Sequence, residues 1–241
     1  IRTQNLDQKI AEPFEKLSNY NASAISYFEM GSLISFIAEK MGKEIFDDFM
    51  KSYLKKNATK PINTKELLDE LALASGYSSE FLERFIQQKN RTNFSLKRYK
   101  KLGDEFQIKV KKNTVQQIPF KVETENKKGE KKEFWFDTDD SMEPKPYNIP
   151  QSDADKIVVN SEYIFPENNF RDNYRYTKGF FANQKKVRFK LFKDIPNPEY
   201  NEIYLNPRTN FNAYDKVLFG LNFKNSSLFE RKFKYSITPY F

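Results

Sequence analysis

Residues 27–53 read YFEMGSLISFIAEKMGKEIFDDFMKSY, and this stretch decides how the chain folds. Its first half has apolar residues at helical spacing, beginning two residues earlier: Ile25, Phe28, Leu33, Ile34, Phe36, Ile37 and Met41. Such a stripe has to be buried against another element. Gly42 is expected to end this helix, because glycine adopts positive φ angles at little cost. A second apolar run over residues 45–54 follows at once, so the sequence predicts two helices packed against each other.

The composition excludes several kinds of active site from these residues. The chain has 241 residues, enough for one large domain or two to three small ones. It contains no cysteine and no histidine, which excludes disulfides, a thiol nucleophile, a histidine base and a histidine-ligated zinc site. It begins at Ile1 with neither a secretory signal nor a run of apolar residues that could span a membrane as a helix. We therefore expect a fragment of a longer protein, with no cofactor of its own.

The formal charge of +8 raises the question of a nucleic-acid partner. The basic residues are scattered, and short runs such as Lys127-Lys128 and Lys131-Lys132 are separated by Gly and Glu. The sequence has no glycine-rich phosphate loop, zinc-finger spacing or aromatic RNA-binding signature. A solvated basic surface is therefore favoured, and no nucleic-acid partner is expected.

The first part of the chain reads as helical. Apolar residues spaced by three or four predict an amphipathic helix within residues 1–20, interrupted at Pro13. Two further helices are predicted over residues 63–76 and 78–86, each opened by a polar capping residue. Residues 1–92 are therefore interpreted as a helical domain.

After residue 92 the period of the pattern changes to two. Apolar residues alternate with polar ones over residues 94–96, 106–110, 118–122 and 134–136. Turn sequences such as Gly103-Asp104 bound these segments, so residues 93–169 are predicted to form a small antiparallel sandwich.

Residues 170–241 form a β-rich tail that could begin a further β domain. Short strands are predicted at residues 187–191, 217–223 and 233–237, with a hairpin turn at residues 225–227 joining the last two. The connection that precedes these two strands carries Pro196, Pro198 and Pro207 and is expected to be a rigid, extended loop. The aromatic alternation suits association with an outer membrane, and it suits a soluble edge hairpin equally well.

Residues 27–53 also resemble a part of the zinc aminopeptidases of the aminopeptidase N and leukotriene hydrolase type, the gluzincins. In that family the helices after the metal site open with a tyrosine, and they continue to a Leu-Gly break followed by a Phe and a Tyr. Placing the family tyrosine on Tyr27 aligns Gly42, Phe46 and Tyr53 without a gap. Residues 28–30, Phe-Glu-Met, replace the family's Glu-Lys-Gly.

Three later segments are similar to the same family. NTKELLDELALASGYSSEFLERF, from residue 63, resembles its helix pair; IPFKVETENKKGEKKEFWF, from residue 118, and KIVVNSEYIFPENN, from residue 156, resemble its immunoglobulin-like β domain. The fold class expected is α+β: a helical bundle, an immunoglobulin-like antiparallel sandwich and the β-rich tail. The resemblance identifies the chain as the C-terminal part of a bacterial zinc aminopeptidase that lacks the zinc motif.

The resemblance implies a function for Tyr27. The parent protein would hydrolyse peptides with a zinc ion held upstream of Ile1, and Tyr27 would donate a hydrogen bond to the tetrahedral oxyanion. The fragment would supply the cleft wall and be inactive alone, in a periplasmic or outer-membrane-associated protein. From spacing alone, Tyr27 could instead be a half-buried core residue. The alternative function is a non-catalytic extracytoplasmic interaction or scaffold module of vestigial peptidase ancestry.

Overall fold

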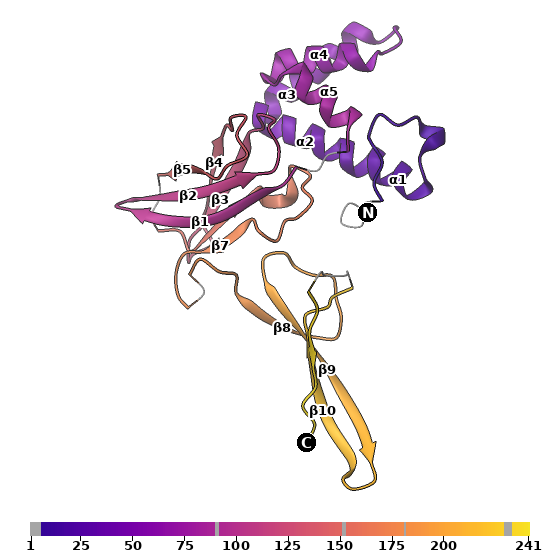
Figure 1. Cartoon of the computed structure of the whole chain (residues 1–241). Helices are drawn as coiled ribbons and strands as arrows, with labels where there is room; N and C mark the ends of the chain where they lie inside the picture. The colour runs from indigo at the N-terminus through magenta and orange to yellow at the C-terminus, as the bar shows by residue number, and fades with distance from the viewer. Residues whose placement is uncertain (1–5, 90–91, 151–152, 181, 229–232) are drawn as a thin grey trace.

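The computed structural model describes residues 6–89, 92–150, 153–180, 182–228 and 233–241. Figure 1 shows the helices gathered at the N-terminal end, a group of strands beside them, and a long sheet that projects away from both. The expected α+β class is confirmed. Among the described residues, no helix combines the length and apolar composition needed to cross a bilayer.

The helical part is built mainly from four α-helices. The helical elements in chain order are η2 (Phe14–Lys16), α1 (Asn19–Ser23), the π-helical η3 (Ala24–Glu29), α2 (Met30–Met41), α3 (Lys43–Asn57), α4 (Thr64–Ser75), α5 (Ser79–Gln87) and, among the strands, η4 (Ser161–Tyr163). The predicted caps are present. The Asn63 side chain accepts from the Lys65 N–H, and the Ser78 side chain accepts from the Phe81 N–H.

The predicted break at Gly42 is confirmed. Gly42 separates α2 from α3 and has φ 91° and ψ 131°, a conformation that residues with a Cβ avoid. It lets the chain change direction between the two helices. The two helices of the opening stretch therefore contact each other as expected.

The prediction of a helix within residues 1–20 is wrong for most of the residues that the structure describes there. Residues 6–13 form no helix, and the segment contributes only the short elements η2 and α1. Pro13 blocks a continuous helix. The buried Asn21 side chain donates to the Leu6 carbonyl and the Gln8 side chain, and these bonds hold the segment in an irregular loop. Residues 1–5 lie outside the described residues.

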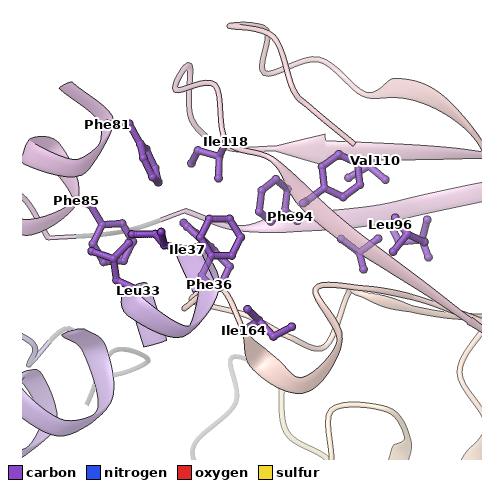
Figure 2. Close-up of a cluster of buried hydrophobic side chains, with 14 of the residues drawn as sticks. Leu33, Phe36, Ile37, Phe81, Phe85, Phe94, Leu96, Val110, Ile118 and Ile164 are labelled. Atoms are coloured by element: carbon purple, nitrogen blue, oxygen red, sulfur yellow. The ribbon is translucent and has the colours of Figure 1, made fainter. Parts of the chain in front are cut away.

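Helix α2 is the centre of the hydrophobic core. Its residues Leu33, Phe36 and Ile37 are fully buried. Figure 2 shows them between Phe81 and Phe85 of α5 on one side and the strands on the other. The helices and the first two sheets therefore share one continuous core.

Seven strands form the first two sheets. They are β1 (Phe94–Leu102), β2 (Glu105–Lys112), β3 (Phe120–Glu125), β4 (Lys131–Phe136), β5 (Lys145–Ile149), β6 (Lys156–Val159) and β7 (Tyr174–Tyr176). The orders are β1-β2-β5 and β4-β3-β6-β7, with antiparallel pairing throughout. Phe120 of β3 contacts Phe94 of β1 and Tyr147 of β5, with ring centroids 5.4 and 4.9 Å apart. Aromatic side chains thus pack one sheet against the other.

The third sheet contains β8 (Val187–Leu191), β9 (Asn201–Asn212), β10 (Lys216–Lys224) and β11 (Ser236–Ile237), in the order β11-β10-β9-β8. The strands predicted near residues 187–191 and 217–223 are confirmed. The third predicted strand is shorter than expected, and the prediction of a tight turn at residues 225–227 is wrong. Asn225 instead bonds to the Phe233 carbonyl and the Tyr235 N–H across a longer connection. The domain boundaries after residues 92 and 169 remain predictions.

Strand β9 occupies part of the region where a proline-rich loop was predicted, and Pro207 lies within it. Pro207 is opposite Leu221. The Leu221 N–H donates to the Pro239 carbonyl, on the side of β10 away from β9. Proline's missing N–H therefore removes no bond to β10. The register with β8 ends at Leu205, so the N–H that proline lacks would have had no partner in β8 either.

We predict that Gly42→Ala lowers the free energy of unfolding by about 1–3 kcal/mol, because alanine is strained at this backbone conformation. Gly31→Ala is the matched control, since Gly31 lies in α2 and alanine favours a helix by up to about 1 kcal/mol. At both positions a methyl group would meet no atom within 4 Å, so the backbone alone distinguishes them. Urea unfolding followed by circular dichroism measures both. Equal effects from the two variants would contradict the assignment of Gly42 as the required hinge.

Candidate functional site

Tyr27 lies on η3, the π-helical turn that precedes α2. The Met30 N–H donates to the Ile25 carbonyl, five residues back, which widens this turn. Ile25 remains buried, whereas Tyr27 is 77% exposed and Phe28 is exposed beside it. The turn thus directs Tyr27 away from the core that its own helix builds. Single π-helical turns of this kind are frequent at functional sites.

Tyr27 borders an open groove of about 470 Å³, called here the Tyr27 groove. One wall is the exposed side of η3 and α2, and the other is the turn that follows β6. The lining residues are Tyr27, Phe28, Gly31, Ser32, Ser35, Glu39, Glu162, Tyr163 and Ile164. The groove therefore joins a helix and a turn that lie more than 120 residues apart in the sequence.

The second wall has a strained backbone. Asn160, Glu162 and Tyr163 all have positive φ angles, of 52°, 59° and 59°. Residues with a Cβ pay of order 1–3 kcal/mol each for such conformations, and the strain often clusters at functional sites. The Tyr163 ring packs edge-on against Phe170, with centroids 4.6 Å apart. This contact fixes the aromatic wall opposite Tyr27.

A buried polar network holds that turn in place. The Asn160 side chain accepts from the Phe165 N–H at 2.8 Å and donates to the Phe165 carbonyl at 2.6 Å. It also donates to the carboxyl of Glu167, which accepts from Asn173 and from the Phe94 N–H as well. Glu167 thus ties the turn to the first strand. Burial raises the pKa of Glu167. The three hydrogen bonds that its carboxyl accepts lower the pKa but do not cancel the effect of burial, and the result is a pKa of about 8.

Lys121 fixes the first wall. It lies on β3, is 3% exposed, and donates to Glu39 of α2 and, at 3.0 Å, to Glu133 of β4. Burial lowers the pKa of Lys121, but the two carboxylates outweigh burial and hold it above its ordinary value. Lys40, the next residue of α2, lies over the Trp135 ring at 5.4 Å. The polar edge of α2 is therefore attached to the sheet, as its apolar stripe is.

The groove offers hydroxyl groups and carboxylates. The hydroxyls of Tyr27, Tyr163 and the two serines can donate to carbonyl oxygens, and Glu39 and Glu162 can accept from N–H groups. Such a surface suits the backbone of a polypeptide. Within the described ranges, no group of three or more Asp or Glu side chains is arranged to hold a metal ion. The described residues therefore offer no ligand set for zinc, and the family resemblance puts the zinc ligands upstream of Ile1.

Sequence reasoning proposed Tyr27, whose role stays a prediction, and it missed the opposite wall. KIVVNSEYIFPENN was interpreted as a last strand with its exit, yet β6 ends at Val159 and the strained turn follows. The available signal was Asn160, because asparagine tolerates positive φ better than most residues. Nothing in the sequence pattern indicated that Glu162 and Tyr163 would share that conformation.

Comparison with known proteins gives little further information. No family model matches the chain, and no curated protein matches it. A solved structure of Legionella pneumophila aminopeptidase A in complex with aspartic acid is similar over part of the fold. The identity is 12% and the TM-score 0.49; the match covers 61% of this chain and 18% of the Legionella chain. This chain thus spans less than a fifth of that protein, and no functional conclusion rests on the likeness.

We predict that Glu167 makes stability fall as pH rises. Its pKa in the folded protein, about 8, exceeds the ordinary value of 4.5, so the folded state keeps a proton that the unfolded state releases between these pH values. The contribution of Glu167 to the free energy of unfolding is greatest below about pH 4.5. It declines toward pH 8, by up to about 1.4 kcal/mol per pH unit. Glu167→Gln, which resembles the protonated acid, should remove that decline.

Urea unfolding at intervals from pH 5 to pH 8 measures the effect as a difference in slope between wild type and variant. The exposed Glu162→Gln, from the strained turn itself, is the matched control and should keep the wild-type slope. Parallel slopes for wild type and Glu167→Gln would contradict the prediction.

Proposed function

We propose that this chain forms one wall of the substrate groove of a peptidase of the aminopeptidase N type. Tyr27 is the residue that acts on the substrate in this proposal. The observation that carries it is the position of Tyr27, exposed on a π-helical turn at the border of an open groove lined with polar groups. The resemblance of residues 27–53 to the tyrosine-bearing helices of that family supports it.

The role proposed for Tyr27 is to donate a hydrogen bond to the oxyanion that forms when a peptide carbonyl becomes tetrahedral. The O–H group of a phenol can donate this hydrogen bond to the oxyanion. Its helix is fixed on both edges, by Phe36 in the core and by Glu39 on Lys121. The backbone that carries Tyr27 is thus held in place, and a positioned donor can favour the transition state over the ground state.

The remaining polar groups of the groove are proposed to hold the peptide. The lining residues of the same groove include Ser32, Ser35, Tyr163, Glu39 and Glu162. An extended peptide presents alternating donors and acceptors, which this mixture can pair. The open shape of the groove suits a polypeptide chain rather than a small enclosed ligand.

Three finer features belong to the same proposal. The zinc ion expected in the parent protein would supply the metal chemistry of peptide hydrolysis, and its ligands would come from residues outside this chain. The two sheets made by β1–β7 would correspond to the immunoglobulin-like domain of the family. The protein would act outside the cytoplasm, in the periplasm or at the outer membrane.

A second candidate is a non-catalytic module that binds peptides in the Tyr27 groove. One observation favours it: the family's Glu-Lys-Gly is replaced at residues 28–30. In this candidate Tyr27 would contribute to affinity and not to rate.

We predict that Tyr27→Phe lowers kcat for peptide hydrolysis by about 100-fold in the protein that contains this chain, while KM changes by less than about threefold. Only the hydroxyl is removed, and the bond it makes exists only in the transition state. Tyr20→Phe is the matched control, because Tyr20 is equally exposed and does not line the groove. It should leave both constants unchanged.

An unchanged kcat in Tyr27→Phe would remove the assigned role. If the same variant still bound peptide with reduced affinity, as measured by calorimetry, the non-catalytic module would be the better account. This chain alone is expected to show no hydrolysis.

A further inference from the structure

The sheet β8–β11 has one face made almost entirely of apolar residues. Directly paired residues of neighbouring strands point to the same face. The register pairs Phe189 with Ile203, Phe211 with Val217, and Phe223 with Ile237. Alternate residues along all four strands therefore join in a single surface.

This surface is called here the apolar sheet face. Its large exposed side chains are Val187, Phe189, Leu191, Phe211, Val217, Phe219, Ile237 and Phe241, with exposed fractions from 40% to 84%. Phe241 belongs to it because it exchanges backbone hydrogen bonds with Phe219. No charged residue lies among the paired positions of this face. Figure 1 shows that the sheet projects from the rest of the molecule.

The opposite face of the same sheet is polar. It carries Arg188, Lys190, Arg208, Lys216 and Lys224, together with several asparagines. Near the base of the sheet this face is covered: Tyr204 is buried and donates to Glu202 at 2.6 Å. The two faces therefore differ sharply in what they can contact.

We propose that the apolar sheet face is the interface of a homodimer, in which two copies of this chain pack their sheets face to face. With about 200 Å² for a large side chain, the exposed fractions leave roughly 800–1,000 Å² of apolar surface per copy. Stable interfaces bury about 800 Å² per partner, whereas the largest patch of an ordinary monomer is about 300–600 Å². Sheets commonly bury such faces by stacking about 10 Å apart.

Charge and backbone pairing favour a second copy over a lipid surface. A two-fold contact brings the apolar sheet face against itself and buries no charge, because the basic residues lie on the opposite face. Among the described residues, the outer edge of β8 and the short β11 leave backbone groups unpaired at the sheet edges. Hydrocarbon could not satisfy those groups, whereas water can reach them at the rim of a dimer. The proposal is independent of the Tyr27 groove.

Sedimentation velocity from about 1 to about 200 µM tests the proposal, since interfaces of this size have micromolar or tighter affinities. Wild type should pass from monomer to dimer. Phe219→Glu should weaken the dimer by about 100-fold or more, because it places a carboxylate within the interface. Phe14→Glu, at an exposed phenylalanine outside the sheet, and Asn210→Glu, on the opposite face, are the matched controls and should dimerise as wild type does.

A milder probe keeps the test valid if Phe219→Glu fails to fold. The chain has no cysteine, so Thr209→Cys places a single thiol on the apolar sheet face and Asn210→Cys places one on the opposite face. Maleimide should label Thr209→Cys more slowly, by at least about fivefold, above the dimer concentration than below it, while Asn210→Cys should react equally at both.

A wild-type protein that stays monomeric at 200 µM, or a Phe219→Glu variant that still dimerises, would overturn the proposal. Mixed phosphatidylcholine and phosphatidylglycerol vesicles provide the competing test. A monomer that sediments with these vesicles, and loses that binding in Phe219→Glu, would assign the face to a membrane surface instead.

Discussion

Helix α2 is confined from two directions at once, and the rest of the structure depends on this confinement. Its ring of Phe36 packs against Phe165 at 4.9 Å and Trp135 at 6.0 Å, so the helix cannot rotate without opening a cavity. Its Glu39 is the partner of Lys121, a lysine too deeply buried to remain unpaired at low cost. Packing fixes the apolar side of α2, and an ion pair fixes its polar side.

The Tyr27 groove follows from that confinement. Tyr27 sits one turn before α2 and inherits its orientation, while the π-helical turn carries it outward. The opposite wall is strained at Asn160 and Tyr163, and the hydrogen bonds of buried Glu167 offset that strain. Both walls are thus held by buried groups rather than by the groove surface, an arrangement that keeps a binding site in shape before any ligand arrives.

The sequence was informative where a local rule has few exceptions. Helical spacing and the glycine at position 42 predicted the α2–α3 pair, and alternation predicted the central strands. Prediction from the sequence failed where contacts between distant residues determine the local structure. Asn21 holds an irregular loop where a helix was expected. Pro207 is tolerated in β9, where a loop was expected, because its nitrogen faces away from β10. Of the candidate site, only the family resemblance indicated Tyr27, and its role stays a prediction. The strained turn depends on contacts of Asn160 and Glu167 that no pattern encodes.

The claim that helices and sheets are held by one shared core can be tested with the single tryptophan. Trp135 lies on β4 against Phe36 of α2, so its fluorescence reports the contact between the two parts, and circular dichroism at about 222 nm reports the helices. In urea, the two signals should give coincident transitions with one midpoint. Helices that unfold in a separate transition from the Trp135 signal would contradict the account.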